Sequence, residues 1–497
     1  MRKSFIVSLL FCTIFGVSYL QAQWAKAYSG LQEENPTAAL LIEEGKLLVA
    51  GFSLIRTNPN SYTTELEYKP WFMQISDNGS GAERLLFNSE KTGADGKLSI
   101  QEWVRSLRPT EDGGYILAGY MKSSWPEGEL INDYNCAFLL KLSAEFQIEW
   151  QRFFGNDDGT TEERALAVEP TDDGGYIAVG STSSFGMGGR DVLVMKLDSA
   201  GQVVWQKAYG GEGREEAHLV QQTSDGGFIV IGYTTSFQSE IDPQEGEPAE
   251  EPGPPDAPRI WVLRLNPEGA LIWQQLCGRD YDLAYSMVLT PEGEVLLGGS
   301  SEGEPVEGQE SDRELFLLKL REDGDIAFQR TFVSESDACL THLIQRGENK
   351  FLAVGTLELE GDKDLLLIQF ADTGHIDWMR IFGAGEVDGQ ISQETGAVVA
   401  VSEADEITVV GNTSRLGPQG DDLLVLRLTS DGRVPNCDLM RSLERYPLRD
   451  LGTIPVKTTV EFTASEISPV NIEFHATPSS VGMIRDVCQA KKNLLRR

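Results

Sequence analysis

The sequence has few of the residues with which enzymes most often bind metals or activate nucleophiles. Its 497 residues include only four histidines and six cysteines. No HExxH, CxxC or CxxH spacing occurs among them, which excludes the common zinc-site patterns. No GxSxG, P-loop or GxGxxG motif stands in a strand–helix context, so the usual hydrolase and nucleotide motifs are missing too. We interpret His218 and His342, which precede predicted turns, as buried hydrogen-bonding residues.

Positive charge is also scarce. The chain has 42 lysine and arginine residues against 77 aspartate and glutamate residues, a formal net charge of −35. Such a surface repels nucleic acid and anionic lipid, so we expect neither as a partner. In the simplest interpretation the charge keeps the protein soluble. Binding of cations or of a basic partner is the alternative.

The one long apolar run of the sequence lies at the amino terminus. Arg2 and Lys3 precede an apolar run from Ser4 to Leu20, and Ala22 follows at a position suited to cleavage. This order is typical of a secretory signal, and the run is short for a membrane span. We therefore predict a signal peptide over 1–22, no membrane span, and a secreted, periplasmic or cell-surface location.

Glycine, in contrast, is abundant, with 51 residues, and much of it belongs to a repeat. The clearest copies are TEDGGYILAG (110–119), TDDGGYIAVG (171–180) and TSDGGFIVIG (223–232). Each copy predicts a hairpin, because Asp-Gly supplies the positive φ of a tight turn and the apolar run after it is typical of a short strand covered on both faces. Weaker copies bring the number to seven, with final glycines at 51, 119, 180, 232, 299, 355 and 411.

A second motif follows each hairpin and predicts how the repeats close into a ring. VLVMKLDSAGQVVWQKAYGG (192–211) is typical of a third strand, a turn and a fourth strand with a large aromatic residue, here Trp205. The seventh copy lacks this aromatic strand, whereas QWAKAYSG (23–30) supplies one. We therefore predict an all-β fold, a seven-bladed β-propeller over 23–437 that is closed by the N-terminal strand, with the aromatic residues packed between blades.

The tail, 438–497, leaves the repeat. Two of its stretches, 457–468 and 470–477, alternate apolar and polar residues enough to be strands. We predict a short C-terminal β extension that packs against the last blade.

Five cysteines follow the predicted signal peptide, so at least one thiol is free or pairs with another chain. Cys136, Cys277 and Cys339 lie in apolar strand-like runs and are predicted to be buried. Cys437 and Cys488 flank the tail, and they are the candidate disulfide of an exported protein.

Acidic residues precede the first strand of the hairpin in several copies. Glu163, Glu216, Asp282 and Asp337 each stand shortly before an alanine of this strand. Carboxylates at equivalent loops would ring one mouth of the propeller channel and attract cations. The alternative, which we favour, is that they bond to nearby turn amides.

Insertions between the second and third strands emerge on one rim of the predicted propeller. Two of them, 239–259 and 302–314, are rich in proline and glutamate and are predicted to be disordered loops. Insertions in the first two blades carry aromatic residues instead. These are our candidate ligand-binding residues: Tyr62, Tyr68, Trp125 and Tyr134.

The sequence predicts no cofactor and no metal site. SFGMGGRD (184–191) is glycine-rich but lies between two predicted strands, which is not the context of a phosphate-binding loop. GNDDGTTEE (155–163) holds several carboxylates, but their spacing does not follow the EF-hand loop. Calcium is kept as an alternative.

The DGGYIAVG run and the segment SFGMGGRDVLVMKLDSAGQVVWQKAYGG after it resemble the secreted Asp-Gly-Gly propeller repeats common in Bacteroidetes-type proteins. The resemblance covers roughly 23–437 and implies the propeller architecture and an exported or surface protein, without a defined function. LDSAGQVVW (197–205) is also similar to the tryptophan-docking repeat of pyrroloquinoline-quinone propellers, which implies an alcohol dehydrogenase or an outer-membrane assembly scaffold. That dehydrogenase class usually has eight blades and an adjacent cysteine pair, which this sequence lacks.

Together these patterns favour a monomeric binding or scaffold module that holds a protein or glycan partner on one propeller rim, without catalysis. The alternative is a propeller enzyme that acts on polysaccharide, or a quinone-dependent oxidoreductase. Two converging carboxylates with a tyrosine or histidine over the channel would favour the enzyme.

Overall fold

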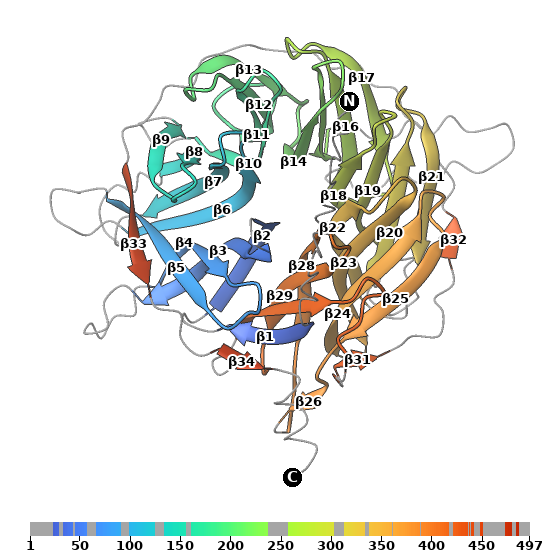
Figure 1. Cartoon of the computed structure of the whole chain (residues 1–497). Helices are drawn as coiled ribbons and strands as arrows, with labels where there is room; N and C mark the ends of the chain where they lie inside the picture. The colour runs from blue at the N-terminus through green and yellow to red at the C-terminus, as the bar shows by residue number, and fades with distance from the viewer. Residues whose placement is uncertain are drawn as a thin grey trace, which may run out of the picture.

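Seven antiparallel sheets are arranged around a common axis in the computed structural model (Figure 1). All of the named elements are strands. In the described part of the chain no helix is long and apolar enough to cross a membrane. The structure describes residues 23–28, 33–42, 45–56, 66–90, 99–124, 134–155, 161–236, 257–302, 313–332, 337–359, 361–387, 389–416, 421–435, 437, 439–441, 448–450, 473–479 and 484–486.

Each sheet is one blade, and in blades 1–6 the first four strands follow one another along the chain from the axis outwards. Blades 1 to 3 are β2 (Glu33–Leu41), β3 (Leu47–Arg56), β4 (Leu66–Ile75), β5 (Ala82–Glu90); β6 (Ser99–Pro109), β7 (Tyr115–Ser124), β8 (Tyr134–Leu142), β9 (Ile148–Phe154); and β10 (Glu163–Pro170), β11 (Tyr176–Thr182), β12 (Asp191–Leu197), β13 (Val203–Tyr209). Blades 4 to 6 are β14 (Glu215–Gln222), β15 (Phe228–Thr234), β16 (Arg259–Leu265), β17 (Leu271–Cys277); β18 (Leu283–Leu289), β19 (Val295–Glu302), β20 (Arg313–Leu320), β21 (Ile326–Phe332); and β22 (Ala338–Gln345), β23 (Lys350–Leu359), β24 (Asp362–Ala371), β25 (Ile376–Phe382).

Blade 7 joins the two ends of the propeller. Its first three strands are β28 (Glu394–Val401), β29 (Ile407–Thr413) and β30 (Asp422–Leu428), and its fourth is β1 (Trp24–Tyr28). β1 pairs with β30 from Trp24 opposite Arg427 to Tyr28 opposite Leu423. The predicted seven-bladed propeller and its closure by the N-terminal strand are therefore confirmed. A two-stranded ribbon of β26 (Glu386–Val387) and β27 (Gln390–Ile391) precedes β28.

The two faces of the ring differ in their connections. The loop face carries the end of the second strand and the start of the third strand of each blade, which are Thr182 and Asp191 in blade 3. The turn face carries the Asp-Gly turns. The predicted insertions therefore open onto the loop face, although most of their residues lie outside the described part of the chain.

A bulge in the first strand explains why the last glycine of each repeat recurs. In blade 2 the register shifts between Val104 and Ser106, just after the point where Gly119 faces this strand. A Cβ atom on Gly119 would lie 2.2 Å from the carbonyl oxygen of Trp103, and the equivalent clash occurs in all seven blades. A larger residue would force the first two strands of the blade apart.

The two glycines of the Asp-Gly-Gly turn have different functions, as blade 3 illustrates. Gly174 has a φ of 76°, which favours glycine. A Cβ on Gly175 would lie 2.2 Å from the carbonyl oxygen of Leu197. Lys196 Nζ lies 2.8 Å from the Asp173 carboxylate and ties the turn to the third strand. Burial tends to raise the pKa of Asp173, but hydrogen bonds from Lys196 and the turn hold it at about 2.

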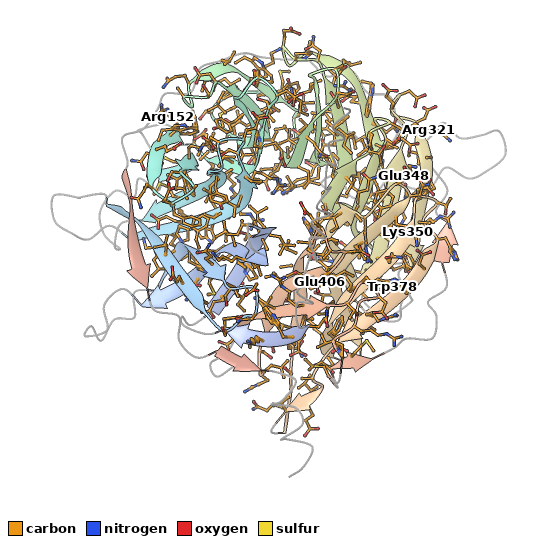
Figure 2. The ribbon with its side chains drawn as sticks, in the orientation of Figure 1. Arg152, Arg321, Glu348, Lys350, Trp378 and Glu406 are labelled. Atoms are coloured by element: carbon orange, nitrogen blue, oxygen red, sulfur yellow. The ribbon has the colours of Figure 1, made fainter. Side chains whose placement is uncertain are left out.

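Large aromatic residues pack between blades, as predicted. In six blades the aromatic ring of the fourth strand lies against a turn glycine of the next blade, on which a Cβ would come within 2.8–3.1 Å of the ring. Side chains fill the space between neighbouring blades, and Trp378 is labelled among them in Figure 2. The pairs are Trp24–Gly79, Trp150–Gly201, Trp205–Gly269, Trp273–Gly324, Phe328–Gly374 and Trp378–Gly432.

The octet that closes the ring adds three hydrogen bonds to this packing. Trp24 Nε1, Lys26 Nζ and Tyr28 Oη donate to the successive carbonyl oxygens of residues 77–79 in blade 1, at 3.1, 2.9 and 2.9 Å. The spacing of two residues brings all three side chains to one face of the strand. β1 is therefore bonded to β30 through its backbone and to blade 1 through its side chains.

The second copy of the octet makes the same contacts inside the ring. In β13, Trp205 Nε1, Lys207 Nζ and Tyr209 Oη donate to the carbonyl oxygens of residues 267–269 in blade 4, at 3.2, 2.7 and 2.6 Å. The repeated W-x-K-x-Y pattern is thus a device that joins one blade to the next, and the N-terminal copy uses it to close the ring.

The described parts of the tail add a fifth strand to the outer edge of four blades. They are β31 (Met440–Arg441) on blade 6, β32 (Leu448–Asp450) on blade 5, β33 (Glu473–Ser479) on blade 1 and β34 (Ile484–Asp486) on blade 7. The expected packing on the last blade holds for β34, whereas the other three strands lie elsewhere. Each outer edge offers unpaired backbone groups, so an extended segment can bond to any of them. The predicted strand 457–468 lies outside the described residues.

Candidate functional site

One pair of side chains can be compared across all seven blades at the loop face. It consists of the residue after the repeated glycine, on the second strand, and the residue opposite it on the first strand. In blade order the pairs are Asn35–Phe52, Trp103–Tyr120, Arg164–Ser181, Glu216–Tyr233, Leu283–Ser300, Cys339–Thr356 and Thr395–Asn412. Aromatic and charged side chains occur only in the pairs of blades 1–4, so this part of the loop face is the candidate site.

Four aromatic side chains form a continuous row across blades 1 and 2. The ring centroids of Phe52 and Tyr68 are 5.7 Å apart, those of Tyr68 and Trp103 are 5.5 Å apart, and those of Trp103 and Tyr120 are 4.9 Å apart. All four side chains are half-buried. We call these residues the aromatic row. Such a row presents apolar ring surface together with the polar edges of tyrosine and tryptophan.

An arginine connects the aromatic row to a polar cluster in blades 3 and 4. The guanidinium of Arg164 lies 5.2 Å from the ring centroid of Tyr120, within the range of a cation–π contact. The same guanidinium lies 3.4 Å from Glu216 on β14 and 3.4 Å from Glu162. Tyr120, Arg164 and Glu216 therefore link three consecutive blades.

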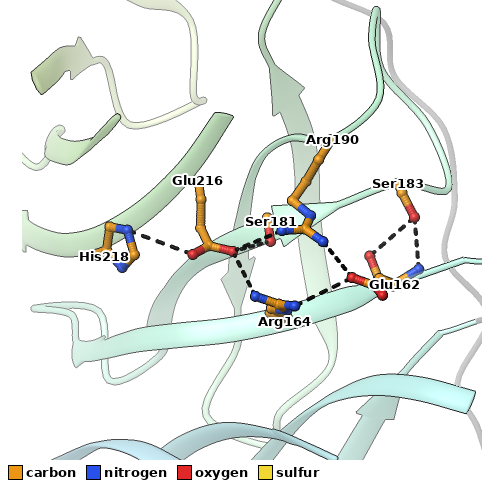
Figure 3. Close-up of polar contacts among 7 residues, drawn as sticks. All are labelled: Glu162, Arg164, Ser181, Ser183, Arg190, Glu216 and His218. Atoms are coloured by element: carbon orange, nitrogen blue, oxygen red, sulfur yellow. Dashed lines mark hydrogen bonds and ion pairs between the residues drawn. The ribbon is translucent and has the colours of Figure 1, made fainter. Parts of the chain in front are cut away.

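A second arginine shares both carboxylates of this cluster (Figure 3). Arg190 lies 2.5 Å from Glu162 and 3.8 Å from Glu216. Ser181 Oγ donates to Glu216 at 2.9 Å. We call Glu162, Arg164, Arg190 and Glu216 the polar cluster. Because each carboxylate faces two guanidinium groups, the cluster is held together by a network rather than by single ion pairs.

His218 extends the polar cluster towards Tyr233. Its Nε2 lies 3.7 Å from Glu216, and its ring stacks on Tyr233 with centroids 5.7 Å apart. Burial lowers the pKa of His218, and although Glu216 opposes this shift, Arg105 and Arg164 add to it. Burial raises the pKa of Tyr233. At neutral pH both side chains are therefore uncharged, and each can donate and accept a hydrogen bond.

The predicted channel-mouth carboxylates occupy different positions in the blades. Glu163 is fully buried and accepts a hydrogen bond from Thr182, which lies opposite it. The pairing places Glu215, not Glu216, at the equivalent position of blade 4, where it accepts from Thr234 at 2.7 Å. Two residues before each bulge, six blades have such a buried acid: Glu34, Glu102, Glu163, Glu215, Asp282 and Glu394.

The other two predicted carboxylates differ from each other. Asp282 is buried and accepts the backbone N–H of Arg279 at 2.7 Å. Asp337 is exposed and accepts the backbone N–H of Arg313 at 2.8 Å, while Ala338 takes the position of the buried acid in blade 6. Of the four predicted carboxylates, the structure brings only Glu216 into the polar cluster.

The predicted aromatic residues are only partly described. Tyr68 belongs to the aromatic row, and Tyr134 is the first residue of β8, opposite Ser123. Tyr62 and Trp125 lie outside the described residues. Trp103 and Tyr120 were not among the predicted residues, although the position directly after the repeated glycine, aromatic in three of seven copies, was a signal that could have found Tyr120.

The described cysteines differ in burial and bonding. Cys136 and Cys277 are buried thiols and Cys339 is a half-buried one. Cys437 is disulfide-bonded, whereas Cys488 lies outside the described residues. Among the described residues no group of three or more histidine, cysteine, aspartate or glutamate side chains could hold a metal ion.

His342 lies between blades 6 and 7 near the axis. Its Nδ1 accepts the backbone N–H of Val399 on β28 at 3.3 Å. Ser286 makes the corresponding bond to Leu343 between blades 5 and 6, at 2.8 Å. Burial lowers the pKa of His342 to about 4, and repulsion from Arg108 adds to this shift.

Acid should therefore weaken the propeller through His342. Its folded-state pKa lies below the unfolded value of about 6.5, so the unfolded chain binds the extra proton and stability falls from pH 6.5 to pH 4. We expect the titration of His342 to lower the free energy of unfolding by about 2–3 kcal/mol over that interval. Urea denaturation of the wild type and of His342→Gln, whose amide oxygen accepts without titrating, should show a shallower pH slope for the variant. Equal slopes would contradict the assignment.

Comparison with known proteins found matches only among solved structures. No family model matches the chain, and no curated protein does. Among solved structures, a PL25 ulvan lyase has 10% identity and a TM-score of 0.46, over 85% of this chain and 97% of that chain. The polysaccharide lyase Uly1 has 11% identity and a TM-score of 0.44 over 81% and 90%. The Synechocystis apocarotenoid oxygenase has 10% identity and a TM-score of 0.42 over 88% and 96%. These values are too low to support an argument about the function of this chain.

Proposed function

We propose that this protein is an exported glycan-binding propeller, and that it holds its ligand on the loop face of blades 1–4. The observation that carries the proposal is the aromatic row of Phe52, Tyr68, Trp103 and Tyr120, whose half-buried rings each lie 4.9–5.7 Å from the next ring, between centroids. A pyranose ring presents a face of C–H groups, which packs against the apolar face of an aromatic ring and leaves its hydroxyls free to bond.

The polar cluster supports the same proposal, because it lies at the end of the row. Glu162 and Glu216 are hydrogen-bond acceptors, whereas Arg164 and Arg190 are donors, and Arg164 contacts both the cluster and Tyr120. A sugar chain laid along the row would meet both kinds of group at one end. Residues that bind a ligand are held in place here by the sheet pairing of four blades, which keeps the entropic cost of binding low.

The proposal includes the remaining expectations from the sequence. We propose that the chain is exported by its N-terminal signal and acts as a monomer in the periplasm, at the cell surface or outside the cell. We further propose that it belongs with the secreted Asp-Gly-Gly propellers and acts by binding its ligand, with no cofactor. The alternative ligand is a protein, because partly exposed aromatic rings can also bind a peptide segment.

Substitution of the aromatic row tests the proposal. The mature chain is screened on an array of polysaccharides, and the affinity of the best ligand is measured by isothermal titration calorimetry. We expect Trp103→Ala to weaken binding about 10- to 30-fold, or about 1.4–2 kcal/mol, because it removes the centre of the row. Tyr120→Ala should act in the same direction.

Tyr285→Ala is the matched control. Tyr285 is 38% exposed and lies on β18 of blade 5, outside the aromatic row. This variant loses a tyrosine ring but should keep the wild-type affinity. If no polysaccharide binds, or if Trp103→Ala and Tyr285→Ala bind equally well while both remain folded by circular dichroism, the aromatic row is not a glycan site.

A further inference from the structure

Positive charge gathers beside the aromatic row in a chain that is otherwise strongly acidic. Arg164 and Arg190 belong to the polar cluster, and Arg105 on β6 and Arg214 before β14 lie close enough to act on its neighbours. Arg105 and Arg164 act electrostatically on His218, while Arg164, Arg190 and Arg214 act on Tyr233. These four arginines come from three blades, and Arg105 lies on β6 two residues after Trp103 of the aromatic row.

The charges of this region do not cancel. Arg164 and Arg190 share the carboxylates of Glu162 and Glu216. In contrast, no carboxylate of the described residues forms an ion pair with Arg105 or Arg214, and both residues are exposed. Two of the four guanidinium groups, those of Arg105 and Arg214, are therefore not neutralised by an ion pair within the described residues, in a protein with a net charge of −35.

The backbone holds Arg190 and Arg214 side by side. These two residues form a parallel bridge between the start of β12 and the start of β14, and the N–H of Glu215 donates to the carbonyl oxygen of Arg190 at 2.7 Å. The Arg214 carbonyl accepts from Thr235 at 3.0 Å. The bridge and the Glu215 bond therefore hold the backbones of Arg190 and Arg214 side by side between blades 3 and 4. Arg190 is paired with Glu162 and Glu216, whereas Arg214 has no ion-pair partner among the described residues.

We propose that the ligand is an acidic glycan, and that Arg105 and Arg214 bind its carboxylate or sulfate groups while the sugar rings lie on the aromatic row. This inference rests on the proposed function and specifies its ligand class. A guanidinium binds a carboxylate or sulfate through two parallel N–H bonds, which gives direction as well as attraction. His218 and Tyr233, both uncharged and able to donate, would complete the set of donors around the anion.

Three polymers test this ligand class on the mature chain. Polygalacturonate carries carboxylates, dextran sulfate carries sulfates, and dextran is uncharged. We expect at least one of the two anionic polymers to bind more than tenfold tighter than dextran, and its affinity to fall as salt is raised. Whichever anionic polymer binds more tightly identifies the anion. If dextran binds as tightly as both, the inference is wrong.

Arginine variants separate this inference from the proposed function. Arg105→Met and Arg214→Met should each lower the affinity for the anionic polymer about 5- to 10-fold. Both should leave the melting temperature unchanged, because neither side chain has an ion-pair partner among the described residues. Arg321→Met is the matched control, since Arg321 is also exposed but lies in a turn of blade 5 at the periphery of the ring (Figure 2). It should bind like the wild type.

The outcomes differ for the two proposals. If Trp103→Ala lowers the affinity for dextran and for the anionic polymers alike, while the arginine variants bind like the wild type, the aromatic row binds glycan and the inference of an acidic ligand is wrong. If the arginine variants lose affinity and Trp103→Ala does not, an anion site exists without the proposed glycan function. If Arg321→Met loses as much affinity for the anionic polymer as Arg105→Met does, the attraction is an unspecific effect of charge and the inference is wrong.

Discussion

Replacing Trp24 with alanine is expected to lower the free energy of unfolding by about 3–5 kcal/mol. The indole is 8% exposed, packs on the turn glycine Gly79 of blade 1, and donates to the carbonyl oxygen of Asp77 at 3.1 Å. Its strand also completes blade 7, and no turn connects it to β30, since 393 residues lie between Tyr28 and Asp422 along the chain. The side-chain contacts of β1 thus oppose the opening of the ring.

Hydrogen exchange shows where such a variant opens. In Trp24→Ala the amides of β1 and of β30, which pair from Trp24 to Tyr28, should exchange much faster than in the wild type. Trp205→Ala is the matched control, because Trp205 makes the same bond to the next blade at 3.2 Å but lies on a strand joined by a short turn to β12. We expect a smaller loss of stability there. Equal losses, with β30 still protected in Trp24→Ala, would contradict the proposed closing mechanism.

Replacing Arg84 with methionine is expected to lower the free energy of unfolding by a similar amount, about 3–5 kcal/mol. Arg84 on β5 lies 3.2 Å from Glu34 on β2, and both side chains are fully buried. Its guanidinium also lies 5.2 Å from the ring of Trp71. Burial lowers the pKa of Arg84, and Glu34 opposes that shift. Removal of the cation would leave the Glu34 carboxylate buried without its positive partner, a larger cost than the loss of the contact itself.

A double-variant cycle separates the charge from the packing. In Arg84→Met/Glu34→Gln both charges are removed, so we expect most of the stability lost in Arg84→Met to return. Urea denaturation of the wild type, the two single variants and the double variant measures the coupling. A double variant no more stable than Arg84→Met would mean that Arg84 acts through its packing on Trp71 alone.

The fold could be predicted because its signals are local and repeat seven times. The Asp-Gly turn, the glycine that faces the bulge and the aromatic residue of the fourth strand each arise from contacts within one blade or with the next blade. The octet at 23–30 could be matched to 204–211 by residue identity alone. The three hydrogen bonds from this octet to residues 77–79 then explain why the same residues recur in both copies.

The candidate site was predicted only in part, because its contacts join blades. Glu216 was grouped with Glu163 although Glu163 lies two residues before its alanine and Glu216 only one, and the pairing aligns Glu163 with Glu215. Neither the distance of 5.5 Å between Tyr68 and Trp103 nor that of 3.4 Å between Arg164 and Glu216 has any trace in sequence spacing.

The sequence by itself determined the seven blades, their all-β character and the strand that closes the ring, since backbone hydrogen bonding and side-chain periodicity act within one repeat. Only the tertiary structure decided which side chains meet at the loop face. That choice depends on which neighbouring blades pack together and on the bulge that the first strand of every blade contains. The packing of neighbouring blades brings Tyr68 into contact with Trp103, 35 positions away in the sequence, and Arg164 into contact with Glu216, 52 positions away.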